Sequence, residues 1–232
     1  MILKNQLNFN KLTMKHIYHF DQSIIFRKTK EDFGGLSNMA AGFKLSINKI
    51  PVKTSEAIYQ ACRFPHLPEV QEKIIEQKSP MAAKMVGKPF RDKTRSDWNE
   101  VRVEVMEWCI RAKLAQNFIG FGSLLEKTYN KKIVEDSHKD DFWGAISEKD
   151  AKTLTGQNVL GRLLMKVRKI YFSDNKYTLL KVDPLSIPDF NLYSNTITEI
   201  DARKEFCDQI MNDFKEYKSP FDNNNKTEGL FD

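Results

Sequence analysis

The strongest constraint on the fold is an apolar stripe in the middle of the chain. Between residues 97 and 117, apolar side chains recur at steps of three or four: Trp98, Val101, Val105, Trp108, Ala112 and Ala115. This spacing is typical of one face of an amphipathic helix that packs against a core. A helix of that length spans roughly 30 Å, the diameter of a small domain. We therefore expect the other elements to be arranged around it.

Shorter helices are predicted ahead of this one. The apolar period becomes helical at Thr54 and closes before Pro65, and a second helix is expected over 69–78. Ser79 precedes a proline, a pair that typically begins a helix, and Gly87 stands where that helix would end.

The flanking regions complete the predicted fold. Residues 158–171 carry a second strong amphipathic pattern, and residues 199–217 carry a weaker one. Between residues 20 and 50, apolar and polar positions alternate loosely and glycines mark turns, which predicts short strands. The predicted fold class is mainly α (α+β), a compact helical domain with a small β-sheet.

Composition limits the class of protein. The 232 residues include 37 basic and 31 acidic ones, and the net charge of +6 suits an anionic ligand without demanding one. The three cysteines are far apart and lack zinc-type spacing, so we expect no disulfide framework, no metal and a reducing, cytoplasmic location. No apolar run approaches the roughly 18 residues of a membrane span, and the N-terminal stretch lacks the apolar segment of a signal peptide.

Several common catalytic motifs are absent from the sequence. It contains no P-loop, GxGxxG, HExxH or GxSxG segment, so nucleotide-hydrolysing, Rossmann, zinc-protease and serine-hydrolase assignments have no support. We expect no bound cofactor.

Six short polar and aromatic segments remain as carriers of chemistry. They are FGGLSN at 33–38, TSEAIYQ at 54–60, SPMAAK at 79–84, DW at 97–98 with Arg102, DDFWG at 140–144, and GQNVLGRLLM at 156–165. Each alone has an ordinary structural explanation. Glu56 suits a helix N-terminus, Trp98 lies on the apolar stripe, and Lys84 would usually be solvated. Their joint occurrence, in this order and spacing, is the stronger signal.

Together the six segments resemble the NADAR (YbiA-like) family, over roughly residues 20–170. The resemblance implies a catalytic domain over 1–172. A C-terminal extension over 173–232 would follow, partly helical and ending in a disordered tail from Ser219. Because the motifs end at Met165, we expect the extension to be dispensable for the chemistry.

The resemblance also implies an activity, that of an N-glycosidase, a hydrolase that cuts a ribose–nitrogen bond. Within the family, the chain resembles a bacterial branch that reverses DNA ADP-ribosylation by removing ADP-ribose from guanine. Such an enzyme would act as an antitoxin to a cognate ADP-ribosyltransferase toxin. The expected partners are an ADP-ribose-containing or nucleotide-like substrate, modified DNA and that toxin, with no membrane. One alternative is an N-glycosidase of riboflavin-pathway intermediates or related metabolites. A third is a non-catalytic module that binds ADP-ribose or NAD.

Catalytic roles follow from the resemblance and from the chemistry. Cleavage leaves positive charge on the ribose, which the carboxylate of Glu56 is expected to stabilise. Asp140 is expected to move a proton, with Asp141 as the alternative. Lys84 is expected to form a Schiff base with the opened sugar, and Lys113 is its rival.

Ten residues are expected to bind the substrate: Phe33, Ser37, Asn38, Tyr59, Gln60, Trp98, Arg102, Trp143, Gly144 and Asn158. Trp98 and Trp143 would hold a flat base between them, and the polar side chains would bind ribose or diphosphate oxygens. The five cations between Lys84 and Arg95 would add charge. Some relatives have a lysine where this chain has Arg63, which removes one possible nucleophile.

Overall fold

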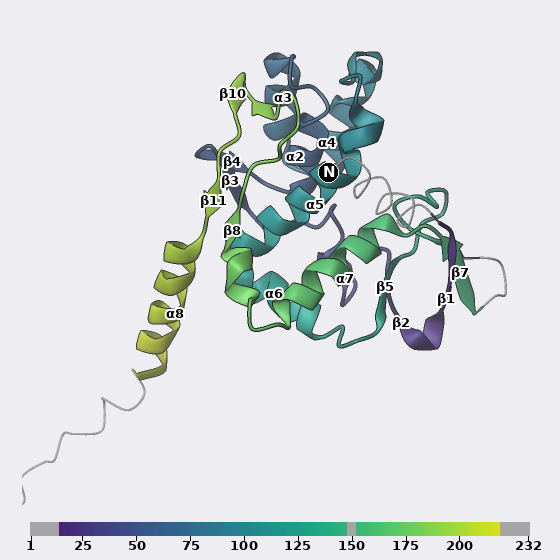
Figure 1. The fold of residues 1–232 in the computed structure, drawn as a ribbon, viewed down its shortest axis with the longest axis vertical. Coiled ribbons are helices and arrows are strands. Elements are labelled where there is room, and N and C mark those ends of the chain that lie inside the picture. The colour runs from purple at the N-terminus through teal and green to yellow at the C-terminus, as the bar shows by residue number, and fades with distance from the viewer. Residues whose placement is uncertain (1–13, 148–151, 219–232) are drawn as a thin grey trace, which may run out of the picture.

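The computed structural model describes residues 14–147 and 152–218, and the long helix α5 (Trp98–Gln116) runs through the middle of the molecule (Figure 1). All six residues of the predicted apolar stripe are buried, which confirms the pattern. Met106, Cys109 and Lys113 on the adjoining stripe are buried as well, so α5 is covered on more than one side. The tail expected from Ser219 lies outside the described residues.

Three short helices pack together beside α5 (Figure 1), namely α2 (Ser55–Ala61), α3 (Pro68–Ile75) and α4 (Pro80–Val86). The hydroxyls of Thr54 and Ser79 cap α2 and α4, each accepting a backbone N–H three residues later at 3.2 and 3.1 Å. The predicted cap at Ser79 is therefore confirmed. Gly87 ends α4 as predicted, but with a right-handed φ of −74°, because the chain continues into the 3-10 helix η3 (Lys88–Lys93).

Two further helices complete the helical part. Helix α7 (Val159–Tyr171) confirms the predicted pattern, whereas α6 (Phe118–Glu126) was not predicted. Its sequence contains Gly120 and Gly122, which are weak helix formers. Gly122 is needed for packing, because a Cβ there would lie 2.3 Å from the hydroxyl oxygen of Tyr171. No helix in the described part of the chain is long and apolar enough to cross a membrane.

The strands form one three-stranded sheet and four two-stranded ones within the described residues. The antiparallel three-stranded sheet has the order β1 (His16–His19), β7 (Thr153–Gly156), β6 (Ile146–Ser147). Strand β2 (Ser23–Phe26) runs parallel to β5 (Lys132–Glu135), so the first strands pair with the second half of the domain.

The stretch from residue 20 to 50 contains fewer extended residues than expected. Besides β2 it holds β3 (Leu45–Ile47) and the first residue of its hairpin partner β4 (Ile50–Val52), and the rest includes the 3-10 turns η1 (Phe20–Gln22) and η2 (Gly34–Leu36). The mainly α (α+β) class is confirmed, with the β part divided into several small sheets.

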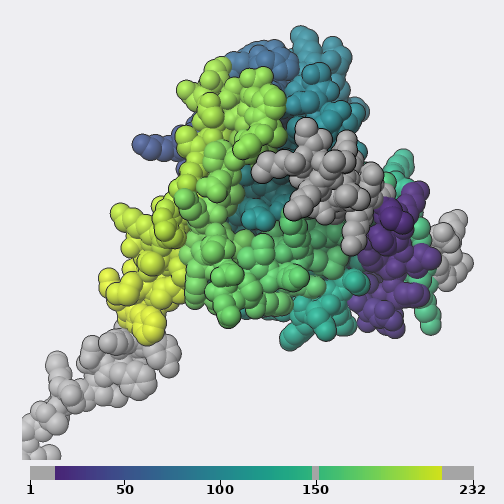
Figure 2. Space-filling view, viewed as in Figure 1, coloured from purple at the N-terminus to yellow at the C-terminus, as the bar shows by residue number. Residues whose placement is uncertain are grey.

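The C-terminal extension packs against the domain as a ribbon. Its elements are η4 (Lys176–Leu180), β8 (Lys181–Val182), β9 (Asn191–Leu192), β10 (Asn195–Thr196), β11 (Ile200–Asp201) and α8 (Arg203–Lys218). Leu180, Phe190 and Ile197 belong to the same buried cluster as α5. Figures 1 and 2 show this ribbon along one side and α8 extending away from the body. The helix predicted over 199–217 begins at Arg203, because Ile200 and Asp201 pair with β8.

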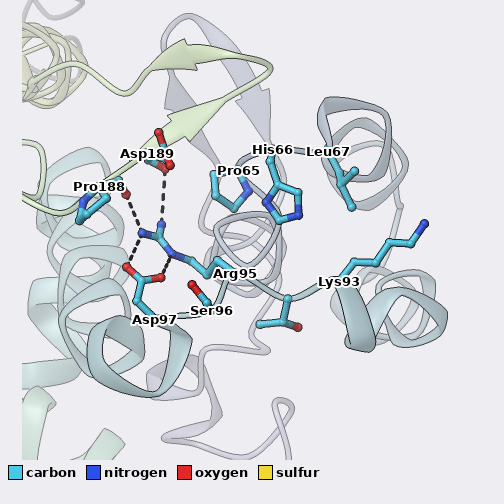
Figure 3. Close-up of a pocket in the computed structure, with 10 residues that line it drawn as sticks. Pro65, His66, Leu67, Lys93, Arg95, Ser96, Asp97, Pro188 and Asp189 are labelled. Atoms are coloured by element: carbon cyan, nitrogen blue, oxygen red, sulfur yellow. Dashed lines mark hydrogen bonds and ion pairs between the residues drawn. The ribbon is translucent and has the colours of Figure 1, made fainter.

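A buried arginine joins the extension to the domain (Figure 3). Arg95 donates to both carboxylate oxygens of Asp97, at 2.5 and 2.8 Å, and to the carbonyls of Pro188 and Asp189, at 2.6 and 3.4 Å. A cavity of about 700 Å³ lies beside this joint, with His66 on its other side. The division at residue 172 stays a prediction, but the extension shares the buried core of the domain.

Candidate active site

Glu56 is the centre of the candidate site. It stands in the first turn of α2 with 5% of its surface exposed. Oε1 accepts an N–H from Gln60 Nε2 and Oε2 accepts one from Asn38 Nδ2, both at 2.7 Å. Burial raises the pKa of Glu56, and these two hydrogen bonds, with the charges of Lys84 and Arg63, oppose that rise. Two amide donors thus orient both oxygens of the Glu56 carboxyl, while burial has the largest effect on its pKa.

The loop that carries Asn38 is tied down by a buried lysine. Lys113 on α5 is 2% exposed, and its Nζ donates to the carbonyls of Gly35 at 2.7 Å and Ser37 at 3.0 Å. The rings of Phe43 and Phe121 lie 4.4 Å from this nitrogen. Burial lowers the pKa of Lys113 to about 7. Because the amine is engaged beneath the loop, Lys113 positions Asn38 against Glu56.

The same loop places two other predicted residues. The hydroxyl oxygen of Ser37 accepts the backbone N–H of Met39 at 3.1 Å, and Ser37 is 3% exposed. Phe33 is partly buried against the core. Both residues shape the loop that carries Asn38.

Aromatic rings form a wall beside the carboxylate. Tyr59 contacts Trp98 with ring centroids 5.1 Å apart and Trp143 at 5.8 Å, and Phe142 contacts Trp143 at 5.0 Å. Since Tyr59 already touches both indoles, a base would stack on the wall rather than enter directly between Trp98 and Trp143. Trp143 is the partly exposed indole and offers a surface for stacking.

Arg63 and Arg102 cover the two ends of this wall. The Arg63 guanidinium carbon lies 4.4 Å from the Trp98 ring centroid, and that of Arg102 lies 3.8 Å from the Phe142 centroid. Both side chains are partly buried. Two cations thus flank a flat apolar surface next to Glu56.

Glu135 is a second carboxyl at the site, and the sequence analysis missed it. It ends β5, and burial raises its pKa to about 7, with further upward contributions from the charges of Asp140 and Glu56. Lys84, exposed on α4, acts in the opposite direction: its charge lowers the pKa of both Glu56 and Glu135. The available signal was a glutamate closing an apolar strand shortly before the DDFWG segment.

The two aspartates of that segment are engaged in holding the corner. Asp140 Oδ1 accepts the backbone N–H groups of Phe142 at 3.1 Å and Trp143 at 2.9 Å, which fixes the turn. Asp141 pairs with Lys15 at 2.6 Å, and that contact lowers its pKa. The charge of Asp140 still raises the pKa of Glu135, whereas Asp141 is paired with Lys15.

Gly144 and Asn158 hold the backbone behind the site. A Cβ at Gly144 would lie 2.5 Å from the carbonyl oxygen of Glu135, so only glycine permits the corner to close on β5. Asn158 has no exposed surface; its Nδ2 donates to the Ile133 carbonyl at 2.8 Å and its Oδ1 accepts the Glu135 N–H at 3.1 Å. Its amide is used by β5, so we assign Asn158 to positioning Glu135 and no longer to substrate contact.

Unpartnered polar atoms concentrate at this cluster. Within the described residues, nine buried side-chain nitrogen or oxygen atoms lack a hydrogen-bond partner. Six of them belong here: Asn38 Oδ1, Tyr59 Oη, Gln60 Oε1, Arg63 Nε, Trp98 Nε1 and Arg102 Nε. Buried polar groups are rarely left unpaired in folded proteins, so this concentration points to a polar ligand that completes them.

Comparison with known proteins assigns the same region to one domain family. The sequence profile of the NADAR domain matches residues 25–170. A riboflavin biosynthesis protein of Vibrio vulnificus is 30% identical over 205 residues, which is 86% of this chain and 53% of that protein. The chain thus spans about half the length of that relative.

Smaller relatives match along most of their length. N-glycosidase YbiA of Escherichia coli is 35% identical over 150 residues, covering 64% of this chain and 88% of YbiA. The NMR structure of E. coli YbiA superimposes with a TM-score of 0.55 at 33% identity, covering 64% of this chain and 84% of that structure. Sequence and fold therefore agree on the relationship, and the shared region contains the cluster around Glu56.

Proposed function

The chain belongs to the NADAR family, and on that premise we propose that it is an N-glycosidase that hydrolyses a ribose–base bond in a nucleotide-like substrate. The carrying observation is Glu56, buried, held by two amides and surrounded by unpartnered polar atoms. The name of its relative YbiA supports the same activity.

Glu56 performs the electrostatic step in this proposal. As the bond between the anomeric carbon and the base nitrogen breaks, its electron pair leaves with the base and positive charge develops on the ribose. A buried carboxylate stabilises that charge strongly, because little water screens it. Asn38 and Gln60 keep both oxygens oriented through their 2.7 Å hydrogen bonds.

Glu135 or Asp140 moves the proton. Water must lose a proton as its oxygen bonds to the anomeric carbon, and the leaving base must gain one. A group whose pKa is near 7 serves best at neutral pH, and the pKa of Glu135 is about 7. Asp140 has one oxygen committed to two backbone N–H groups. We therefore place Glu135 ahead of Asp140, with Asp141 last because Lys15 pairs with it.

Lys84 is the proposed covalent participant: its amine bonds to the anomeric carbon as the base leaves, and opening of the ring C–O bond gives a Schiff base. Water then adds to that carbon, which releases the sugar and restores the free amine. The charge of Lys84 acts on both carboxyls from a capped helix, whereas the Lys113 amine is buried beneath the 33–38 loop. Borohydride reduction during turnover, followed by peptide mapping, tests this assignment. An adduct on Lys84 is expected. An adduct on Lys113, or none in an active enzyme, contradicts it.

Two substrates are proposed, and different observations favour them. The order of the six segments favours ADP-ribosylated guanine in DNA, with an ADP-ribosyltransferase toxin as partner. The names of the Vibrio relative and of a chloroplastic riboflavin biosynthesis protein of Arabidopsis thaliana, 34% identical over 114 residues, favour riboflavin-pathway intermediates. The catalytic residues are the same in both cases.

Parallel incubations separate these substrates. The protein is mixed with ADP-ribosylated guanosine, with the same adduct in single-stranded DNA, or with a ribosylated riboflavin-pathway intermediate, and the released base and sugar are measured by chromatography. Glu56→Gln is the inactive control. If base and sugar are released from just one of these compounds, that compound is the substrate. Binding of ADP-ribose without release from any substrate would instead support a non-catalytic module.

A further inference from the structure

Helix α8 carries an apolar stripe that continues beyond the body of the protein. At its first turn, Phe206 packs against Phe118 and Tyr177, with ring centroids 5.1 and 5.8 Å apart. Further along, α8 extends away from the body (Figures 1 and 2). Ile210 and Phe214 follow Phe206 at steps of four, so they lie on the same side of the helix. The stripe therefore starts in a core contact and continues where the body no longer covers it.

The uncovered part of this stripe is large and contiguous. Met211 and Phe214 are 58% and 63% exposed, and Cys207 beside them is exposed as well. Tyr177, where the body meets the helix, is 52% exposed and extends the same surface. Single exposed apolar residues are ordinary, but a contiguous patch of them marks an interaction site.

One flank of the stripe carries two opposite charges. Asp208 and Lys215 are exposed, and they are seven residues apart, about two turns, which places them on the same flank of α8. At about 10 Å along the axis, they are too far apart to pair with each other. Neither forms an ion pair within the described residues. Both charges are therefore available to another molecule.

A second copy of the same helix matches the stripe and the charges together. When two copies of α8 lie antiparallel about a two-fold axis near the middle of the helix, the same flank of each meets that of the other. With Asp208 of each copy level with Lys215 of the other, two symmetric ion pairs form. In that register the Phe214 ring of each copy fits between Cys207 and Ile210 of the other, as a knob in a hole. A two-fold interface requires a surface complementary to itself, and α8 provides one.

We propose that α8 is a homodimerisation helix through which two copies of this chain pair antiparallel. The bodies then lie at opposite ends of the pair, because α8 extends away from the body (Figure 1). A contact between two helices of 16 residues is smaller than the about 1,200 Å² typical of stable complexes, so the dimer is weak and its dissociation constant lies in the micromolar range. None of its residues belongs to the candidate active site.

Sedimentation velocity of the intact chain over a micromolar concentration series tests the pairing. The sedimentation coefficient should rise with concentration. Phe214→Ser should raise the dissociation constant roughly tenfold or more, because it removes the central knob, and Met211→Ser should raise it less. Met81→Ser is the matched control, since Met81 is also 58% exposed but lies on α4. It should dimerise like the wild type.

A charge exchange tests the register. Asp208→Lys alone and Lys215→Asp alone should each weaken the dimer, because each sets like charges opposite one another. The double variant, Asp208→Lys with Lys215→Asp, should recover the wild-type affinity. Thermal melts should show that every variant is folded, since the substituted side chains are exposed.

Cys207 reports the direction of the helices. It is exposed, whereas Cys62 and Cys109 are buried, so a bismaleimide reacts with Cys207 selectively. In the antiparallel register the two copies of Cys207 lie nine residues, or about 14 Å, apart along the axis, and only a long cross-linker joins them. In a parallel pair they would lie side by side, and a short cross-linker would suffice.

Three outcomes overturn the proposal. A chain that stays monomeric at every concentration does so, and slow maleimide labelling of Cys207 in that monomer would assign the apolar face to residues 219–232. A dimer that is unchanged by Phe214→Ser and by both single charge variants would place the interface elsewhere. Efficient joining by the short cross-linker would contradict the antiparallel direction.

Discussion

Arg95 and Arg63 are neighbours with opposite surroundings. The backbone N–H of Arg95 donates to the carbonyl of Arg63 at 2.9 Å. The Arg95 guanidinium is met by a carboxylate and two carbonyls from its own chain, as Figure 3 shows. Among the described residues, the Arg63 guanidinium lies over the Trp98 ring and its Nε has no partner.

This contrast separates two regions. In the closed region, around Arg95, buried polar groups have protein partners; in the open region, around Glu56, several have none among the described residues. In the joint around Arg95, folding alone satisfies the buried charge. Substitutions in the joint should therefore change stability and leave the activity of folded protein intact, and substitutions in the open cluster should do the reverse.

The largest expected effect is that of Glu56→Gln, in the open region. Loss of the charge should lower kcat by roughly 10³-fold. The fold should persist, because the Asn38 and Gln60 amides each have an unpartnered oxygen and can turn to accept the new N–H group. Steady-state kinetics beside a thermal melt measure both quantities. Near wild-type turnover would refute the role of Glu56.

Arg95→Met tests the closed region. Removing one partner of a buried ion pair should reduce the free energy of unfolding by about 3 kcal/mol. The kcat of the folded fraction should stay close to that of the wild type. Chemical denaturation gives the stability, and Arg111→Met, which breaks the Glu107 pair, should cost less than about 1 kcal/mol. If Arg95→Met abolishes kcat in folded protein, the two regions are not separable.

Lys113→Met should affect both stability and activity, and so combine the effects expected in the two regions. The carbonyls of Gly35 and Ser37 would lose their donor, reducing the free energy of unfolding by about 2 kcal/mol. Activity should fall as well, because the loop also orients Asn38 against Glu56. Denaturation and kcat are measured on the same preparation. A stability loss without any change in kcat would show that the loop position does not matter to the chemistry.

Glu135→Gln should give the smallest stability effect, visible as a pH dependence. A carboxyl whose folded pKa is raised to about 7 binds more protons in the folded than in the unfolded state, so stability falls as pH rises from about 4.5 to 7. The variant should flatten this fall by about 1 kcal/mol after allowance for solvent screening. Glu56 contributes a slope in the same direction, so part of the fall should remain.

Melting temperatures from pH 4.5 to 8 measure this slope, with Glu107→Gln at the surface as control. The pH profile of kcat gives a second readout, because the limb near pH 7 should disappear in Glu135→Gln. An identical profile in wild type and variant would remove Glu135 from the proton-transfer step.

Regular patterns made the helical core predictable. The stripe on α5 repeats over many turns, and the Ser79–Pro80 pair marks the start of α4, so both follow from local sequence. Helix α6 could not be predicted in this way, because its glycines are weak helix formers. Gly122 is needed there for close packing against Tyr171. Strand β2 lies in the stretch where short strands were predicted, but local sequence did not indicate its parallel partner β5 in the second half of the domain.

The candidate site divides in the same way. Glu56, Asn38 and Gln60 lie within recognisable segments, and the structure brings them into contact. Glu135 reaches the site only through the pairing of β5 with β2, which no local pattern reports. Asn158 was predicted to contact the substrate because amide side chains often do. The sequence does not show that its amide bonds the backbone of β5.

The parallel pairing of β2 with β5 sets a schedule for the nascent chain. Strand β2 ends at Phe26 and β5 at Glu135, so at ordinary ribosomal rates roughly 5–20 s separate their synthesis. The helix bearing Glu56 can form early, but Glu135 cannot join it until β5 has emerged. The carbonyls that engage Arg95 follow later still, at residues 188 and 189. During translation, the chain therefore carries Glu56 for some time before Glu135 is present to complete the candidate site.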